Sequence, residues 1–296
     1  MDFMRRFDWI RTSLCFEPRG HDMMSGGFLY PPTRADADCG ILFIETSGCL
    51  PMCGHGTIGM VTFGLEHGLI RPRTPGELVV EVPAGVLRVS YAQVGDRIQS
   101  VRIRNVPSYL AVRDVEVDVP GFGKIRLDVA YGGNYYAIIE PQGPYAGLDG
   151  MGASRLVELS AAIRERVRAQ VNPVHPLEPT ISGVSHVLWA DKSRSLGADG
   201  RNAVFYGDRA IDRSPCGTGT SARMAQLMAR GRLQIGDRFV HESYIGSQFV
   251  GRVEESTRLG DHAAIVPSIE GCAIQTGLNI VTVDDADPFW RGFQVA

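Results

Sequence analysis

Residues 53–68 read CGHGTIGMVTFGLEHG and residues 216–231 read CGTGTSARMAQLMARG, so one pattern occurs twice in the chain. Without any gap, five positions are identical in the two segments: Cys53/Cys216, Gly54/Gly217, Gly56/Gly219, Thr57/Thr220 and Gly68/Gly231. A weaker likeness between PAGVLRV at 83–89 and IGSQFVGRV at 245–253 extends the repeat. Internal similarity of this kind indicates related structural units. We therefore predict two similar halves, each with a sheet wrapped around one central helix.

Both repeated segments carry the features of a helix that follows a cysteine. Glycine is unfavourable inside helices, so each helix should begin at about the second glycine, and Gly68 and Gly231 fit the C-caps. Each cysteine then lies beside a helix N-terminus, where free amide groups favour a thiolate and can hold a carboxylate. Two such helix ends that face one another would place a thiol on each side of a small anion. That arrangement suits removal of a proton from one face of a carbon and its return on the other, without metal or cofactor.

The segments around the repeat mainly predict strands. Apolar and charged residues alternate in VRIRNVP at 101–107 and in KIRLDVA at 124–130, which is typical of half-buried strands. The segments YYAIIEP at 135–141 and HVLWADK at 186–192 are predicted strands as well. A surface helix is predicted at 153–171, whose apolar side chains share one face: Leu156, Leu159, Ile163 and Val167.

Composition indicates an ordinary globular protein. The 296 residues are 44% apolar and 21% charged, with a net charge of −3, and no basic stripe suggests nucleic acid. The sequence contains no apolar run of membrane-spanning length, and its start is interrupted by charges, unlike a signal peptide. We therefore expect a cytoplasmic protein that does not bind a membrane. Six cysteines lack paired spacing, and for four of them (Cys15, Cys39, Cys49 and Cys272) a buried free thiol is the simplest expectation.

The cysteine motif is compatible with three other functions. GHGTIG at 54–59 matches the Gly-x-Gly-x-x-Gly of dinucleotide sites, but Gly48 and Pro51 separate it from the strand before it. Cys49, Cys53 and His55 are candidate zinc ligands, yet no second ligand pair follows at finger-like spacing. A thiol hydrolase that pairs Cys53 with His186 or His241 would leave Cys216 and the repeat unexplained.

Several motifs resemble the proline racemase family: ETSGCLPMCGHGTIG at 45–59, DRSPCGTGTSARMAQL at 212–227, EPRGHDMM at 17–24 and RNAVFYGD at 201–208. Within that family they are most similar to the 4-hydroxyproline 2-epimerases, and the likeness runs nearly end to end. It implies an α/β (α+β) fold of the diaminopimelate epimerase type, with the active site between two domains. We place the first domain at 1–120 plus about 270–296, and the second at 121–269.

The resemblance also implies roles for individual residues. Cys53 and Cys216 would be the two acid–base groups. The substrate carboxylate would be bound by Gly54, Gly217 and Thr218. The ring nitrogen would be held by His55 and Asp212, and a further substrate contact would be His186. Specificity would depend on Ser25 and Tyr206, which stand where proline racemases carry phenylalanine, so a ring hydroxyl could be accommodated.

The expected reaction is cofactor-independent epimerisation of trans-4-hydroxy-L-proline to cis-4-hydroxy-D-proline, with the small-molecule substrate as partner and a homodimer possible. The alternatives are a proline racemase, a trans-3-hydroxy-L-proline dehydratase or an inactive amino-acid-binding paralogue. The family's dehydratases usually carry threonine in place of the second cysteine, so Cys216 favours epimerisation. Family members usually begin with a further strand, which this sequence does not show, so a strand of the first domain is expected to be absent.

Overall fold

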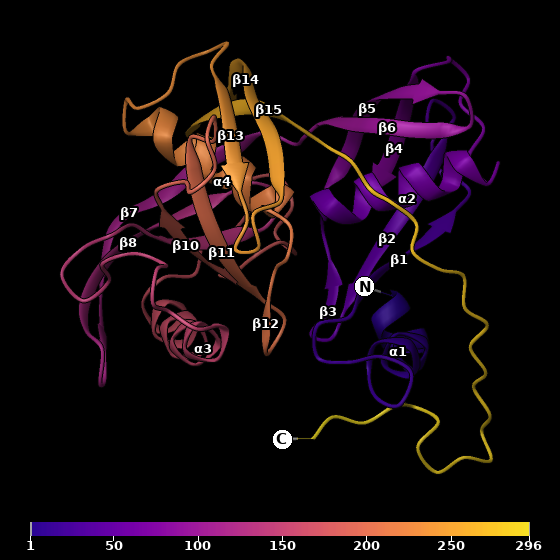
Figure 1. The fold of residues 1–296 in the computed structure, drawn as a ribbon, viewed down its shortest axis with the longest axis horizontal. Coiled ribbons are helices and arrows are strands. Elements are labelled where there is room, and N and C mark those ends of the chain that lie inside the picture. The colour runs from indigo at the N-terminus through magenta and orange to yellow at the C-terminus, as the bar shows by residue number, and fades with distance from the viewer. Residues whose placement is uncertain (1, 296) are drawn as a thin grey trace.

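The computed structural model describes residues 2–295, which form two lobes side by side (Figure 1). Strands from both lobes belong to one continuous hydrogen-bonded set, which over the described residues follows the order β1-β2-β4-β5-β6-β15-β14-β13-β11-β10-β9-β8-β7. Each lobe places one of the two repeated helices against the inner face of its strands, as the repeat predicts.

The first lobe is an open sheet that curves around one helix. Its elements are α1 (Asp2–Cys15), α2 (Gly54–Glu66), β1 (Ser25–Tyr30), β2 (Cys39–Glu45), β3 (Gly48–Leu50), β4 (Glu77–Val82), β5 (Gly85–Val94) and β6 (Arg97–Arg104). On α2, the side chains of Ile58 and Val61 are buried in the core beneath the sheet. The short strand β3 pairs back onto β2 before α2 begins, so β2 does not turn directly into the glycine cluster. This junction differs from the tight strand–turn–helix of a dinucleotide site.

The second lobe is a closed barrel. Its elements are β7 (Ser108–Val119), β8 (Gly123–Tyr131), β9 (Tyr135–Ile139), α3 (Ala153–Gln170), β10 (His186–Asp191), β11 (Gly200–Tyr206), β12 (Ala210–Ile211), α4 (Gly217–Ala229), β13 (Arg238–Glu242), β14 (Gln248–Leu259) and β15 (His262–Gly271). Strand β7 pairs with both β8 and β15, and this closes the ring of strands around α4. Consequently every residue of α4 from Gly217 to Leu227 is buried.

Strand β15 connects the two lobes. Its residues 268–271 pair with β6 of the first lobe, while residues 264–265 pair with β7 of the second. A domain boundary near residue 120 stays a prediction. The pairing of β7 with β8 and β15 favours a boundary between β6 and β7, because β7 belongs to the barrel.

The predicted surface helix is confirmed as α3, which buries Leu156, Leu159, Ile163 and Val167. The expected starts of the other two helices were wrong: α2 and α4 begin at the first glycine of each cluster, which makes Cys53 and Cys216 the N-cap residues. Glycine costs little in the first turn, where amide groups have no partner within the helix anyway.

The enclosure of the two central helices differs from the expectation. Both were expected to be surrounded by sheet, and α4 is, but α2 keeps five side chains partly exposed, those of His55, Met60, Phe63, Leu65 and Glu66. The sheet of the first lobe does not close on itself as the barrel does, so only one face of α2 is covered.

Helix α1 was not predicted from the sequence, although Phe3, Phe7 and Ile10 recur at helical spacing. It packs beside the C-terminal segment: the rings of Trp9 and Trp290 have centroids 5.5 Å apart, and the Ser13 hydroxyl donates a hydrogen bond to the Trp290 carbonyl at 2.8 Å. After β15 the chain runs along the first lobe and returns to α1 (Figure 1).

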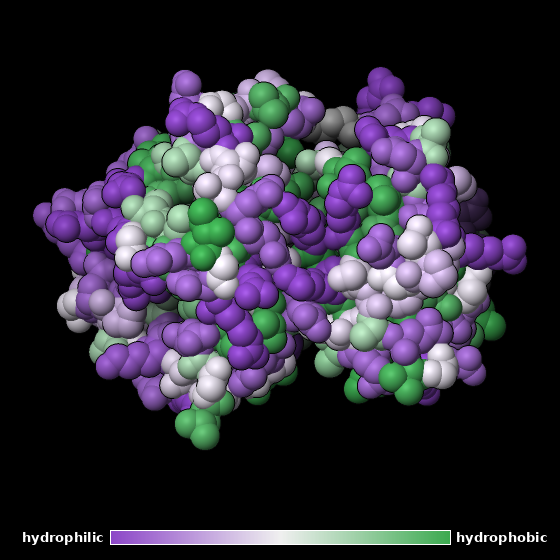
Figure 2. All heavy atoms as spheres, turned by 90° about the horizontal axis from the view of Figure 1, so that it is seen from above, coloured by the Kyte–Doolittle hydropathy of each residue, from purple (hydrophilic) through white to green (hydrophobic). Residues whose placement is uncertain are grey.

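Hydrophilic residues cover much of the face drawn in Figure 2, and hydrophobic ones are scattered among them on both lobes. Among residues 2–295, every helix is too short or too polar to cross a bilayer.

Candidate active site

The two repeated helices meet end to end at their N-termini. A Cβ atom added to Gly54 would lie 2.6 Å from the Cα of Gly217, and one added to Gly217 would lie 2.8 Å from the Cα of Gly54. Real side chains essentially never approach so closely, so only glycine allows this contact. The repeat therefore has a direct structural reason: the two helix ends that carry Cys53 and Cys216 touch across the boundary between the lobes.

The two cysteines occupy equivalent positions with different backbone conformations. Cys53 is extended, with φ −138°, whereas Cys216 has φ 60°. The latter is a conformation that residues other than glycine rarely adopt and that is found mostly at functional sites. The Cys216 amide donates a hydrogen bond to the Ser214 hydroxyl at 3.0 Å, which helps to hold this turn.

Both thiols line one small cavity between the lobes. All ten positions singled out from the sequence lie on its wall: Ser25, Cys53, Gly54, His55, His186, Tyr206, Asp212, Cys216, Gly217 and Thr218. Its volume is about 20 Å³, which holds about one water molecule, so the lobes are in a closed arrangement. The structure thus brings the predicted residues together, while their individual roles remain predictions.

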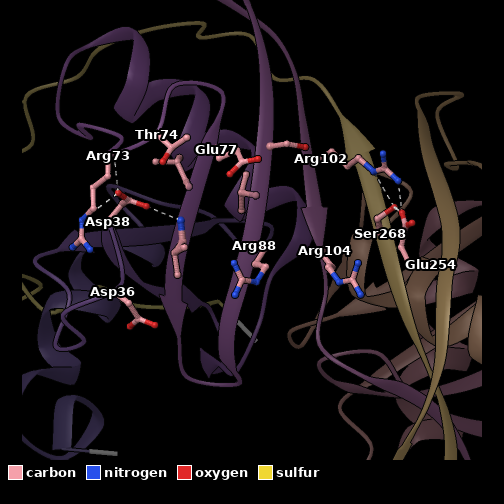
Figure 3. A pocket seen from close by; sticks show the side chains of 14 residues that line it. Asp36, Asp38, Arg73, Thr74, Glu77, Arg88, Arg102, Arg104, Glu254 and Ser268 are labelled. Atoms are coloured by element: carbon pink, nitrogen blue, oxygen red, sulfur yellow. Dashed lines mark hydrogen bonds and ion pairs between the residues drawn. The ribbon is translucent and has the colours of Figure 1, made fainter.

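Three larger hollows lie elsewhere, and one of them, of about 400 Å³, lies beside α3 and β12. A second, of about 490 Å³, lies over β4, β5 and β6, where arginine and carboxylate side chains face one another across the sheet (Figure 3). The third, of about 520 Å³, lies beside β8 and the C-terminal end of α4. None of the three is lined by a cysteine or a histidine. The small cavity holds the reactive groups, and we take it as the candidate active site.

His55 and Asp212 form a charged pair on the cavity wall. Their Nδ1 and Oδ2 atoms are 3.3 Å apart, and the Ser214 amide donates to Asp212 Oδ1 at 2.7 Å. Burial alone would raise the pKa of Asp212, but His55 and the Ser214 hydrogen bonds hold it below its ordinary value. Burial alone would lower the pKa of His55, but the negative charges of Cys53 and Asp212 raise it well above its ordinary value. The pair therefore favours an imidazolium next to a carboxylate.

Tyr136 on β9 contacts the second cysteine directly. Its hydroxyl lies 3.2 Å from Cys216 Sγ and 2.5 Å from the Thr218 hydroxyl. Burial raises the pKa of the Cys216 thiol to about 12, and Asp212 raises it too, whereas the Tyr136 hydrogen bond opposes the change. At neutral pH Cys216 is thus a protonated thiol, ready to donate.

His186, Tyr206 and Ser25 complete the predicted set. Burial lowers the pKa of His186 to about 3, so its imidazole is neutral, and its ring lies 4.7 Å from that of Tyr136. The Tyr206 hydroxyl donates to the Met23 carbonyl at 2.8 Å, and the Ser25 hydroxyl lies 3.5 Å from His55 Nε2. Tyr206 is therefore already hydrogen-bonded, while Ser25 faces His55.

Sequence reasoning missed five residues that line the cavity: Glu45, Leu50, Met52, Asn134 and Tyr136. Asn134 connects the lobes, because its amide donates to the Met52 carbonyl at 2.8 Å and to the Thr218 hydroxyl at 3.3 Å. Asn134 directly precedes the buried strand YYAII. A polar residue next to a buried strand is the sequence feature that could have identified it.

The alternative assignments receive no support from this geometry. Cys49 lies on β3 outside the cavity wall, and within residues 2–295 no three potential ligands cluster as a metal site requires. His241 also lies away from the cavity, where it contacts Thr220 and Asn202. His186 does line the cavity, but its Nδ1 lies 2.6 Å from the Ser185 hydroxyl, a side-chain partner other than a cysteine.

A sequence profile described as proline racemase matches residues 1–294. A protein from Shewanella loihica named 4-hydroxyproline 2-epimerase is 58% identical over 294 residues, which is 99% of this chain and 88% of that protein.

Two solved structures are also similar. A probable proline racemase from Agrobacterium radiobacter with bound carbonate has a TM-score of 0.89 and 33% identity, over 97% of this chain and 84% of that one. A hydroxyproline epimerase from Agrobacterium vitis with bound trans-4-hydroxy-L-proline has a TM-score of 0.88 and 31% identity, over 97% and 83%. These similarities and the two-lobed architecture confirm the predicted fold class.

Proposed function

This chain belongs to the proline racemase family, and from that premise we propose that it epimerises 4-hydroxyproline at Cα with two cysteines and no cofactor. The observation that carries the proposal is the meeting of two cysteine-capped helix N-termini at one closed cavity. The Shewanella loihica relative is named 4-hydroxyproline 2-epimerase and the Agrobacterium vitis structure has trans-4-hydroxy-L-proline bound, which supports the choice of substrate.

The helix ends supply the site for the substrate carboxylate. The first amides of α2 and α4, those of Gly54, Gly217 and Thr218, lie at positive dipole ends and line the cavity. As the Cα proton leaves, negative charge spreads into the carboxylate. Amide groups fixed at helix N-termini stabilise such charge without reorganising, so the helix ends would accelerate the reaction as well as bind.

The two thiols exchange protons with opposite faces of Cα. In one direction Cys53, as thiolate, takes the Cα proton by forming an S–H bond, and the electron pair of the broken C–H bond remains on the substrate. Cys216 then delivers its own proton to the other face and becomes the thiolate. The raised pKa of Cys216 supports its role as the proton donor in this direction. The reverse reaction exchanges the two roles.

The Asp212 carboxylate would hold the ring nitrogen directly, and His55 would act on it through Asp212, which it keeps ionised. The nitrogen of the amino acid carries positive charge, and the carboxylate of Asp212 is its natural partner. The nitrogen would then be fixed on one side of Cα and the carboxylate on another, which leaves the C–H bond aligned with the two sulfur atoms. Substrate orientation of this kind supplies much of the catalytic effect.

Incubation with trans-4-hydroxy-L-proline in deuterium oxide tests the proposal. We expect deuterium at Cα of cis-4-hydroxy-D-proline, observed by NMR and chiral chromatography. Binding without exchange would contradict it in favour of a binding module, and loss of water to an imine would contradict it in favour of a dehydratase.

A further inference from the structure

Glu45 is a carboxylate that the proposed reaction does not use, yet it lies on the cavity wall. It is the last residue of β2 and stands directly opposite Ser25 of β1 in the antiparallel register. Directly opposed residues of such a pair extend their side chains from the same face of the sheet. Glu45 and Ser25 therefore lie together on the first-lobe side of the cavity, where the Ser25 hydroxyl also approaches His55.

The hydrogen bonding of Glu45 is incomplete. Only 2% of the residue is exposed, and its Oε1 accepts a hydrogen bond from the Ser47 hydroxyl. Its Oε2 is buried and has no hydrogen-bond partner among the described residues. A buried carboxylate oxygen without a donor is costly, so such groups are normally satisfied by protein, water or ligand.

The other polar groups of the cavity correspond to the other polar groups of the substrate. The helix amides suit its carboxylate, and His55 with Asp212 suits its ring nitrogen. The C4 hydroxyl is the substrate's remaining donor, and Glu45 Oε2 is a buried acceptor beside Ser25 on the cavity wall that has no donor among the described residues.

We propose that Glu45 is a specificity-determining residue whose Oε2 accepts a hydrogen bond from the C4 hydroxyl of the substrate, while Ser25 contacts the same hydroxyl. This inference rests on the proposed function, because it assigns one substrate group at the same site. A substrate without the hydroxyl leaves the buried carboxylate unsatisfied, and a site built in this way discriminates strongly against such an analogue. Proline should therefore bind and react less well than 4-hydroxyproline.

The test compares Glu45→Gln with the wild type. The variant keeps the shape of the side chain but removes its charge. We expect the ratio of kcat/KM for trans-4-hydroxy-L-proline to that for L-proline to fall roughly ten- to a hundredfold, since hydrogen bonds to charged groups carry about that much discrimination. Glu242→Gln is the matched control: Glu242 is also buried, but it accepts the amides of Arg194 and Ser195 outside the cavity. Its ratio should not change.

Calorimetric affinities for the same two amino acids, measured on all three proteins, separate this inference from the proposed function. If the wild type binds hydroxyproline more tightly than proline and Glu45→Gln removes the difference, the assignment of Glu45 stands even when no turnover is observed. If the wild type epimerises hydroxyproline and Glu45→Gln reduces binding and turnover of both amino acids equally, the assignment of Glu45 is wrong and the proposed function stands. The assignment is also wrong if the wild type binds hydroxyproline and proline equally well.

Discussion

Gly54→Ala should disable the enzyme while leaving the fold in place. The added Cβ would lie 2.6 Å from the Cα of Gly217, a backbone atom that cannot rotate away. Ordinary contact begins at about 3.4 Å, so the ends of α2 and α4 must separate by roughly 1 Å. A displacement of about 1 Å in a catalytic geometry costs on the order of a hundredfold in rate. We therefore expect the rate of Cα deuterium exchange to fall about a hundredfold.

Gly59→Ala supplies the matched control in the same helix. A Cβ added there meets nothing within 4 Å, and its backbone conformation is helical. Alanine stabilises a helix interior relative to glycine by roughly 0.5–1 kcal/mol, so this variant should keep its activity and melt at the same or a slightly higher temperature. Circular dichroism would confirm that both variants are folded. Wild-type exchange in Gly54→Ala, with the structure unchanged, would refute the argument that contact between the helix ends sets the catalytic geometry.

Three further outcomes are expected. Cys53→Ser and Cys216→Ser should each abolish epimerisation, measured by polarimetry, because one thiol cannot serve both faces of Cα; full activity in either would contradict the two-cysteine scheme. Tyr136→Phe removes a hydrogen bond that opposes the rise in the pKa of Cys216, so the limb of the pH–rate profile that reports Cys216 should move to higher pH; an unshifted profile would count against that contact. Burial raises the pKa of Glu45 from 4.5 to about 6. The folded state therefore binds the proton more tightly than the unfolded state, and the resulting free energy of stabilisation is complete below pH 4.5 and is lost as the pH rises through about 6. Glu45→Gln should thus raise the free energy of unfolding by about 2 kcal/mol at pH 7 to 8 and leave it nearly unchanged at pH 4.5, as chemical denaturation at both values would measure.

The repeat and the glycine pattern were enough to predict the two halves and the cavity that holds both cysteines. These features are local: a cysteine, two glycines and a helix occupy one short segment in each half. The closure of the barrel was not predictable in this way, because the pairing of β7 with β15 joins residues that are far apart in sequence. No periodicity in either strand specifies its partner.

The missed cavity residues show a second limit. Tyr136 lies in the continuous buried strand YYAII, and Glu45 ends the buried strand CGILFIE. In such strands a side chain that contacts the cavity cannot be distinguished from one that contacts the core, since both faces are buried. A charged residue at the end of an apolar strand was the signal for Glu45. The importance of Glu45 follows only from the structure, in which its Oε2 is buried without a hydrogen-bond partner among the described residues.

The closed cavity explains why so many costly polar groups are found where the lobes meet. Burial raises the pKa of Cys216 and Glu45 and lowers that of His186, and each change means that the charged form is less stable there than in water. The hydrophobic cores of the two lobes must offset this cost. What the enzyme gains is a site without bulk water, in which amide dipoles act strongly on a developing charge.

A cavity of about 20 Å³ cannot admit an amino acid, so the lobes must move apart for the substrate to enter. In the closed arrangement the ends of α2 and α4 touch, and Cys53 and Cys216 line the same cavity. The pair of catalytic cysteines is therefore complete only in the closed state. A substrate that favours closure also brings these two residues into position. Binding groups far from Cα, such as a ring hydroxyl held by Glu45, can then increase kcat as well as affinity, because they stabilise the closed state in which both thiols reach Cα.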